Sequence, residues 1–209
     1  VGVIPGNEDK THYGRRPNGI YVPRFKNVKS QSPGFLRGYG YQGSGSRERW
    51  EHGLDTPGFG AEFKHALRDY GPWKLRLLGF GECLPSSSNY LEIDPEVEDK
   101  WGVPAIRVHM TYGENEVALM KDAAESAAEI LDAAGATDIE TFVQTNTPGL
   151  AIHEMGTLRM GLDPKTSVLN GYNQAHDVPN LFVTDGACMT SSSCVNPSIT
   201  YMALTARAC

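Results

Sequence analysis

The longest regular pattern in the chain is an apolar stripe at intervals of three and four residues between positions 114 and 134. Such a stripe is typical of a helix that buries one face. Acidic Glu114 and Glu116 occupy its first turn, where the helix dipole favours negative charge, and Gly135 is a natural C-cap. The stripe consists of Val117, Ala123, Ala124, Ala127, Ile130, Leu131 and Ala134. A shorter helix is predicted within residues 56–70 by the spacing of Phe59, Phe63 and Leu67.

Several other segments have the alternation or the short apolar run of a strand, and they are residues 35–42, 75–83, 89–94 and 105–111. Polar residues 95–104 read as a connector between the last two. The triplet Gly43-Ser44-Gly45 resembles the start of a dinucleotide loop, but Glu48 stands where the third glycine belongs, so we expect a turn. Strands joined by turns predict a mainly antiparallel sheet, and with the packing helices the fold class is α+β.

The pattern changes on both sides of this scaffold. Residues 1–34 are rich in Gly, Pro, Asn and basic residues, which predicts extended segments and turns. After the long helix we expect short strands and turns at residues 139–145, 153–161 and 180–187, followed by a last helix from Pro197. We therefore divide the chain into two domains, residues 1–145 and residues 146–209.

Composition and charge exclude some classes of protein. The 209 residues are 40% hydrophobic and 21% charged, with a formal net charge of −6, which argues against a nucleic-acid-binding surface. No apolar run approaches the roughly 20 residues that a membrane span needs. The chain opens on Val1 without a secretory signal and closes on Cys209 inside an apparent helix, so we expect a fragment of a larger protein.

The four cysteines are not spaced as metal ligands. Cys83, Cys188, Cys194 and Cys209 form no CxxC motif and no Cys/His pattern suited to zinc. We expect free, partly buried thiols and no metal site, with a Cys188–Cys194 disulfide as an open alternative.

The first chemical motif is HEMGTLRMG, which starts at His153. Gly156 and Gly161 allow the backbone to approach closely, which would suit an imidazole held beside a ligand. A structural histidine fits the same spacing, and the pattern alone leaves both interpretations open.

The second motif begins with an apolar run at 181–183 that ends on Thr184, Asp185 and Gly186. This is the form of a buried strand with polar groups at its C-terminal end, where ligands bind in α/β sheets. Further along, Asn196 would cap a helix whose first position is Pro197. The free N–H groups of such a helix suit an anion or a developing negative charge, and a capped surface helix is the alternative.

These motifs together resemble a known family. HEMGTLRMG, NLFVTDGACMTSSS and NPSITYMALTAR are similar to the C-terminal signature of the glucose-methanol-choline (GMC) oxidoreductases. Upstream, GRRPNGIYVPRF, FLRGYGYQG and GECLPSSSNYLEIDPEVEDKWGVP resemble the bacterial branch that acts on sugars, glucosides or sugar acids. The resemblance covers nearly the whole chain, and the order of the motifs makes it specific.

The resemblance implies FAD as cofactor and a role for each motif. His153 matches the family's catalytic histidine, which takes the substrate hydroxyl proton while hydride moves to flavin N5. Asn196 matches a second position that hydrogen-bonds the same oxygen. The residues that match the segment against the flavin are Asp185, Gly186, Asn196, Pro197 and Thr200, and there the helix N-terminus would stabilise the reduced flavin. A base must be neutral, so we expect activity to fall at acid pH.

The resemblance also implies partners. Residues 1–145 would form most of the substrate-binding domain, and residues 146–209 would return to an FAD-binding domain. The GxGxxG segment of that domain is not in this sequence, so we expect the chain alone to bind FAD poorly. The implied partners are a small sugar or alcohol, the rest of the polypeptide, and an acceptor protein or quinone, with the bacterial periplasm as the compartment.

There are three alternatives to this function. The first is an oxygen-using oxidase of the same family, and the second is a carbohydrate-binding module that has lost catalysis. A hydrolase using Ser191, Ser192 or Ser193 lacks a GxSxG motif.

Four further polar residues have weaker interpretations. We expect His109 and His176 to be structural. Glu82 is a candidate for substrate contact, and Arg159 is expected to orient its loop or to lie near the flavin.

Overall fold

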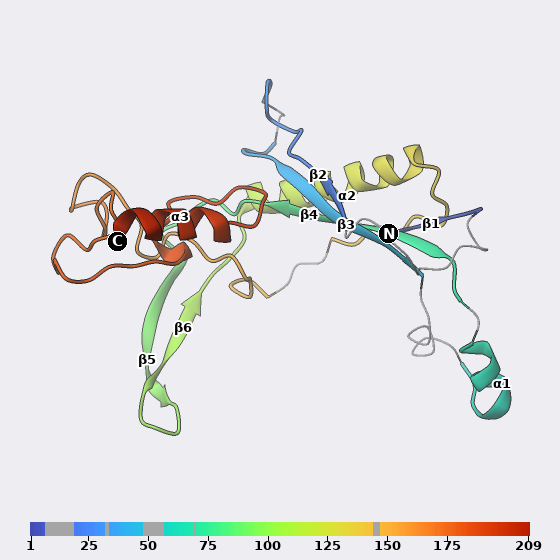
Figure 1. The fold of residues 1–209 in the computed structure, drawn as a ribbon, viewed down its shortest axis with the longest axis horizontal. Helices are drawn as coiled ribbons and strands as arrows, with labels where there is room; N and C mark the ends of the chain where they lie inside the picture. Colours follow the sequence, from blue (N-terminus) through green and yellow to red (C-terminus); the bar gives the residue numbers. More distant parts are fainter. Residues whose placement is uncertain (7–18, 32–33, 48–56, 69, 144–146) are drawn as a thin grey trace.

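The computed structural model describes residues 1–6, 19–31, 34–47, 57–68, 70–143 and 147–209. The predicted domain boundary at residue 145 lies outside these ranges, as do Glu48 and residues 7–18 and 32–33 of the N-terminal segment. Figure 1 shows a sheet beside a long helix, with a separate hairpin and a loop-rich C-terminal part at the end of the molecule opposite α1.

A four-stranded antiparallel sheet forms the scaffold. Its order is β1 (Gly2–Ile4), β4 (Trp73–Gly81), β3 (Tyr39–Arg47) and β2 (Ile20–Val22). The β3–β4 pair is the longest, with Tyr41 opposite Gly79 and Tyr39 opposite Gly81. Every pairing in the sheet is antiparallel, which confirms the predicted fold class.

One face of this sheet packs on α2 (Glu114–Ala133). Tyr39 and Tyr41 point to the helix and are almost fully buried. The Tyr41 hydroxyl donates to the Ala123 carbonyl at 2.6 Å, and burial raises the pKa of Tyr41 to about 12. Opposite the tyrosines, β4 carries glycines, and a Cβ at Gly81 would lie 2.4 Å from a methyl of Leu119. The glycines therefore let α2 approach the sheet closely.

The other face of β3 carries Gly38, Gly40 and Gln42, because side chains alternate along a strand. This face meets the C-terminal segment rather than a helix. A Cβ at Gly40 would lie 3.4 Å from the Cys194 sulfur, and Gln42 hydrogen-bonds Asn196. The sheet thus places residues of the second motif.

A separate two-stranded hairpin consists of β5 (Tyr90–Glu98) and β6 (Pro104–His109). Its polar face holds Tyr90 stacked on His109 at 4.3 Å and an Arg107–Asp94 ion pair at 2.7 Å. Its other face is apolar and half exposed, and consists of Leu91, Ile93, Ile106 and Val108. In Figure 1 the hairpin projects away from the four-stranded sheet.

The C-terminal part contains two helical elements joined by loops. The 3-10 turn η2 (Gly186–Cys188) is followed by α3 (Ser198–Ala208). A small second core of Leu169, Ala175 and Cys188 lies beneath them, with Leu204 of α3 packed against it. Within the described ranges, no helix is long and apolar enough to cross a membrane.

The helix predictions are confirmed. α2 ends one residue earlier than predicted, at Ala133, and the short helix α1 spans Gly60–Ala66. The last helix starts at Ser198, directly after Pro197.

The strand predictions need three corrections. β3 begins at Tyr39 and runs to Arg47, so the predicted turn at Gly43 is wrong. A Cβ at Gly43 would lie 2.3 Å from the Arg76 carbonyl, which shows that glycine serves close strand contact there. β5 continues to Glu98 through the predicted connector, with an irregular register between Ile93 and Glu98 around Pro95. Bulges of this kind accommodate proline in a strand.

The third correction concerns the short strands predicted after α2. Residues 139–143, 153–161 and 180–185 form loops, residues 186 and 187 begin η2, and the pairing near these segments consists of isolated bridges such as Gln174–Phe182. Leu181 and Phe182 are nearly half exposed. The prediction of a buried strand here is wrong, since the apolar residues are exposed and only isolated bridges pair this segment with its described neighbours.

Candidate active site

A cavity of about 350 Å³ brings together three of the predicted site residues, His153, Asp185 and Gly186. Leu91 of β5 and Tyr201 of α3 also line it, so the hairpin and the last helix both contribute. The volume lies at the lower end of the range for small-molecule sites, about 300–1,000 Å³.

The loop that carries His153 is fixed against η2 by backbone hydrogen bonds. Leu158 N–H donates to the Ala187 carbonyl at 3.1 Å, and Met160 N–H donates to the Cys188 carbonyl at 2.9 Å. Gly156, at φ +82°, allows the chain to turn between His153 and Leu158. The two motifs predicted from sequence therefore form one structural unit.

His153 has an atom that the described protein does not satisfy. Its Nε2 is buried and has no hydrogen-bond partner among the described residues. Buried polar atoms in proteins are nearly always paired, so an orphan of this kind calls for an explanation. A ligand hydroxyl in the adjoining cavity would supply the partner.

Asp185 and Gly186 also line this cavity. The Asp185 carboxylate accepts a hydrogen bond from Ala187 N–H at 2.9 Å and so caps η2. A Cβ at Gly186 would lie 2.7 Å from the Glu154 carbonyl. Glycine is thus the residue that lets η2 approach the histidine loop.

Asn196 does not cap α3, so that sequence-based prediction is wrong. The N-cap residue is Pro197, and no side chain caps the helix. The Asn196 Oδ1 instead accepts a hydrogen bond from Gln42 Nε2 at 2.6 Å. This bond to β3 uses the amide oxygen and leaves the Nδ2 group available as a donor.

The other predicted site residues, Asn196, Pro197 and Thr200, do not line the His153 cavity. Pro197 is buried, and Thr200 N–H bonds to the Pro197 carbonyl at 2.9 Å. The helix contributes Tyr201 instead, whose hydroxyl is 2.8 Å from Ser198 Oγ. Tyr201 lies one turn beyond Pro197, and this spacing was the signal that could have found it. No local signal pointed to Leu91.

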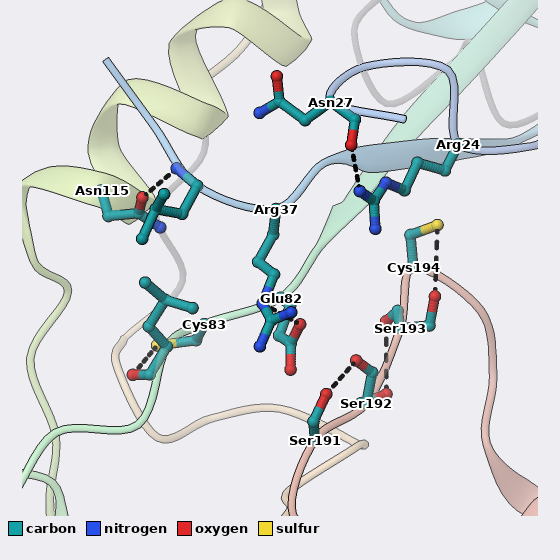
Figure 2. A network of polar contacts seen from close by, with 12 residues as sticks. Arg24, Asn27, Arg37, Glu82, Cys83, Asn115, Ser191, Ser192, Ser193 and Cys194 are labelled. Carbon is teal, nitrogen blue, oxygen red and sulfur yellow. Dashed lines mark hydrogen bonds and ion pairs between the residues drawn. The ribbon is translucent and has the colours of Figure 1, made fainter. Parts of the chain in front are cut away.

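A second, smaller cavity of about 170 Å³ lies where the start of β3 meets the serine segment, which is residues Ser191 to Ser193. Figure 2 shows Arg37 beside Glu82, with the three serines on the neighbouring loop. Arg37 Nε is 3.3 Å from Glu82 Oε2. The cavity is lined by Arg24, Arg37, Gly38, Glu82, Ser191, Ser192, Ser193 and Cys194.

The serines in this cavity are not arranged as a hydrolase nucleophile. Ser191 Oγ donates to the Ser192 carbonyl, and Ser192 Oγ donates to the Ser193 carbonyl. The Ser193 hydroxyl points to the Cys194 sulfur at 3.8 Å. These contacts give no support to the hydrolase alternative.

Other polar residues have structural contacts. His109 Nε2 is 2.8 Å from Glu92 Oε1, and His176 Nε2 is 3.1 Å from Ser167 Oγ. Both contacts are those of structural histidines, as expected. All four cysteines are free, and within the described ranges no cluster of His, Cys, Asp or Glu could hold a metal ion.

The sequence matches known proteins. The family model described as GMC oxidoreductase matches residues 85–205. A 2-methyl-1,2-propanediol dehydrogenase from Mycolicibacterium austroafricanum is 36% identical over 84% of this chain and 32% of its own length. The gluconate 2-dehydrogenase flavoprotein of Pantoea cypripedii is 29% identical over 72% of the chain and 25% of its own length.

A third relative is the fructose dehydrogenase large subunit of Gluconobacter japonicus, 35% identical over 61% of the chain and 23% of its own length. The chain therefore spans a third or less of the length of these three relatives.

Proposed function

Because the chain belongs to the GMC oxidoreductase family, we propose that it supplies the catalytic residues of an FAD-dependent enzyme that oxidises a CH–OH group of a sugar or alcohol. The observation that carries the proposal is the buried, unpartnered Nε2 of His153 at a cavity of ligand size. The names of the three relatives, a diol, a gluconate and a fructose dehydrogenase, support this substrate class.

The residues around His153 are compatible with FAD. Gly186 has no side chain to obstruct a ring, and Asp185 already has a capping bond, so neither fills the cavity. The first turn of α3, which follows Pro197 and has no side-chain cap, would present the N–H groups of Ser198 and Ile199 to an electron-rich edge of FAD, because the Thr200 N–H is already bonded to the Pro197 carbonyl. When bound, FAD supplies the hydride acceptor.

His153 is proposed to act as the base. Its Nε2 would accept the proton of the substrate hydroxyl, the partner that the described residues do not provide. Removing this proton as hydride leaves carbon avoids a high-energy oxocarbenium-like product, and a positioned base contributes about 10²–10⁴ to the rate.

Asn196 is proposed to donate a hydrogen bond to the same oxygen. Its Oδ1 is held by Gln42, so the amide is oriented with Nδ2 directed away from β3. A neutral, preorganised donor stabilises the alkoxide-like oxygen in the transition state. Gln42 thereby positions the donor from the sheet.

We further propose that the enzyme is a dehydrogenase that passes its electrons to an acceptor protein or quinone. The three relatives described above are all named as dehydrogenases. The proton chemistry of His153 and Asn196 is the same for an oxidase, because the acceptor is used after the substrate has been oxidised.

The test is expression of the full-length enzyme that contains this chain, followed by an absorbance spectrum and an anaerobic alcohol panel. The expected results are a flavin spectrum that is bleached by sugars or diols, and little oxygen uptake in an oxygen electrode. A protein without flavin, or a flavin that no alcohol reduces, would contradict the proposal. Rapid peroxide release would show an oxidase instead.

A further inference from the structure

We propose that the cavity lined by Arg37 and Glu82 binds two neighbouring hydroxyls of a neutral sugar, at the end of the substrate away from the oxidised carbon. The proposal of this polyol subsite rests on the proposed function. The subsite would bind the part of the substrate that does not contact the His153 cavity. It comprises Arg24, Arg37, Glu82 and the serine segment.

The groups in the subsite match a vicinal diol. Glu82 has a side chain only 11% exposed, and its Oε2 faces Arg37 Nε at 3.3 Å. Within the described residues, the Glu82 Oε1 and the terminal nitrogens of Arg37 have no other partner. A carboxylate accepts hydrogen bonds and a guanidinium donates them, so two adjacent hydroxyls can bind the pair at once.

The hydrogen-bonding groups of the subsite favour a neutral ligand over an anion. Glu82 offsets the charge of Arg37, and a carboxylate ligand would lie close to the Glu82 carboxylate. The other guanidinium is committed elsewhere, because Arg24 donates to the carbonyls of Lys26 and Asn27. Figure 2 shows Arg24 turned to that loop while Arg37 and Glu82 face each other.

The backbone around Arg37 is held in an uncommon conformation. Arg37 has φ +70°, in the left-handed region that non-glycine residues seldom adopt. The preceding residue is fixed to α2, since Leu36 N–H donates to Asn115 Oδ1 at 2.6 Å. Such conformations are found preferentially at functional sites, where the surrounding structure maintains them.

The subsite lies on the same sheet face as Asn196. Gly38 lines it, a Cβ at Gly40 would contact Cys194, and Gln42 bonds Asn196. Alternate residues of a strand are about 7 Å apart, so Asn196 is one such step beyond the Cys194 end of the cavity. Cys194 packs on Gly40 between them, so the subsite and Asn196 are placed by neighbouring positions of the same segment.

The binding test uses the full-length, FAD-loaded enzyme under anaerobic conditions without an electron acceptor, with His153→Ala as background, so that oxidation of the ligand is slow and limited to one equivalent of flavin. Dissociation constants are measured by calorimetry for D-glucose, D-galactose, D-xylose, D-gluconate and cyclohexylmethanol, a ring alcohol without neighbouring hydroxyls. The variants are Glu82→Gln and Arg37→Met. Arg107→Met, which removes an ion pair on the hairpin, is the control.

We expect each variant to weaken at least one neutral sugar by about tenfold or more, the loss of one hydrogen bond to a charged group. Cyclohexylmethanol should change by less than twofold, and Arg107→Met should affect neither ligand. Retained flavin absorbance shows that the variants fold.

Three results would overturn the subsite. One is unchanged binding of all three sugars, and another is an equal loss for sugars and cyclohexylmethanol. The third is gluconate binding that exceeds glucose binding and is lost in Arg37→Met, which would identify an anion site. Failure of the proposed function would be seen separately, as a wild-type flavin that no alcohol bleaches although sugars still bind.

Discussion

The two side chains proposed to act on the substrate oxygen are held by different parts of the molecule. His153 sits in a loop bonded to η2, with its Nε2 buried and without a described partner. Asn196 precedes α3 and is fixed from the sheet through Gln42. These contacts support the proposed roles, since one group offers an open ring nitrogen and the other an oriented amide.

The Gln42–Asn196 bond predicts that an isosteric substitution of Gln42 reverses the orientation of the Asn196 amide. In Gln42→Glu the new carboxylate can only accept, so the Asn196 amide should turn its Nδ2 to that carboxylate and present Oδ1 to the substrate. We expect the limiting rate of anaerobic flavin reduction to fall by about 10–100-fold, the effect of losing one transition-state hydrogen bond.

The matched control for this prediction is Gln42→Met, which removes the bond without reversing the amide. It should lower the rate less than Gln42→Glu does. If both variants reduce the flavin at the wild-type rate, Gln42 does not position Asn196.

Sequence patterns reached some of these residues and missed others. His153, Asp185 and Gly186 were found because glycine-rich motifs marked them, and they line one cavity. The partner of Asn196 was missed because Gln42 lies 154 residues earlier in the chain. Local spacing favoured a helix cap, and only the tertiary fold shows that β3 takes the amide oxygen.

At the scale of elements, the contact between η2 and the histidine loop predicts the effect of adding one methyl group. In Gly186→Ala the new Cβ would lie 2.7 Å from the Glu154 carbonyl, a backbone atom that cannot rotate away. We expect the His153 loop to shift, with a loss of about 1–3 kcal/mol in stability and a lower rate of flavin reduction.

Gly171→Ala is the control, because a Cβ there would meet nothing within 4 Å. Its melting temperature and rate should match the wild type. Equal behaviour of the two alanine variants would contradict the close approach described for η2.

The start of α2 predicts a pH dependence of stability. Burial alone would raise the pKa of Glu116, but hydrogen bonds from Leu84 N–H, the Asn115 amide and Gly113 N–H outweigh it and hold the pKa below its ordinary value. The ionised form is therefore favoured by folding. Its stabilisation is present above the unfolded pKa and is lost as pH falls through the folded pKa.

Glu116→Gln should therefore destabilise the enzyme near neutral pH by about 1–2 kcal/mol. The difference from wild type should shrink as the medium is acidified below the unfolded glutamate pKa, about 4.3. Thermal melting from pH 3 to 7 measures this. Glu125→Gln, on the exposed side of α2, is the control, and a constant difference at every pH would contradict the role of Glu116.

Elements were predicted best where the hydrophobic pattern repeats over many residues. The twenty-residue α2 was found to within one residue because its stripe repeats over many turns. Of the strands, β3 to β6 were placed, but the ends of β3 and β5 were not, because Gly43 and Pro95 look like breaks in a local pattern. In the fold, Gly43 allows close packing of β3 on β4, and Pro95 lies at an irregularity in the register of the hairpin.

At the scale of the whole molecule, apolar surface remains on the elements that surround the site. Ile199 and Met202 of α3 are 79% and 66% exposed, and Ile93 and Ile106 of the hairpin are each 69% exposed. The chain also spans a third or less of its relatives' length. We propose that the rest of an FAD-binding enzyme covers these faces, and the division at residue 145 stays a prediction.

This proposal predicts that the 209-residue chain, purified by itself, binds FAD poorly or not at all. Ultrafiltration with free FAD should leave no flavin with the protein, whereas the full-length enzyme should retain it. Stoichiometric flavin on the isolated chain would show that the cofactor is held mainly by these residues.

The central claim is that His153 is the base in alcohol oxidation, and anaerobic stopped-flow reduction of the flavin tests it most directly. In the full-length enzyme, His153→Ala should lower the limiting rate of reduction by about 10²–10⁴ while flavin binding is unchanged. His65→Ala, at an exposed position of α1, should reduce at the wild-type rate. A His153→Ala enzyme that is reduced within about threefold of the wild-type rate would contradict the account, since a positioned base contributes far more than that.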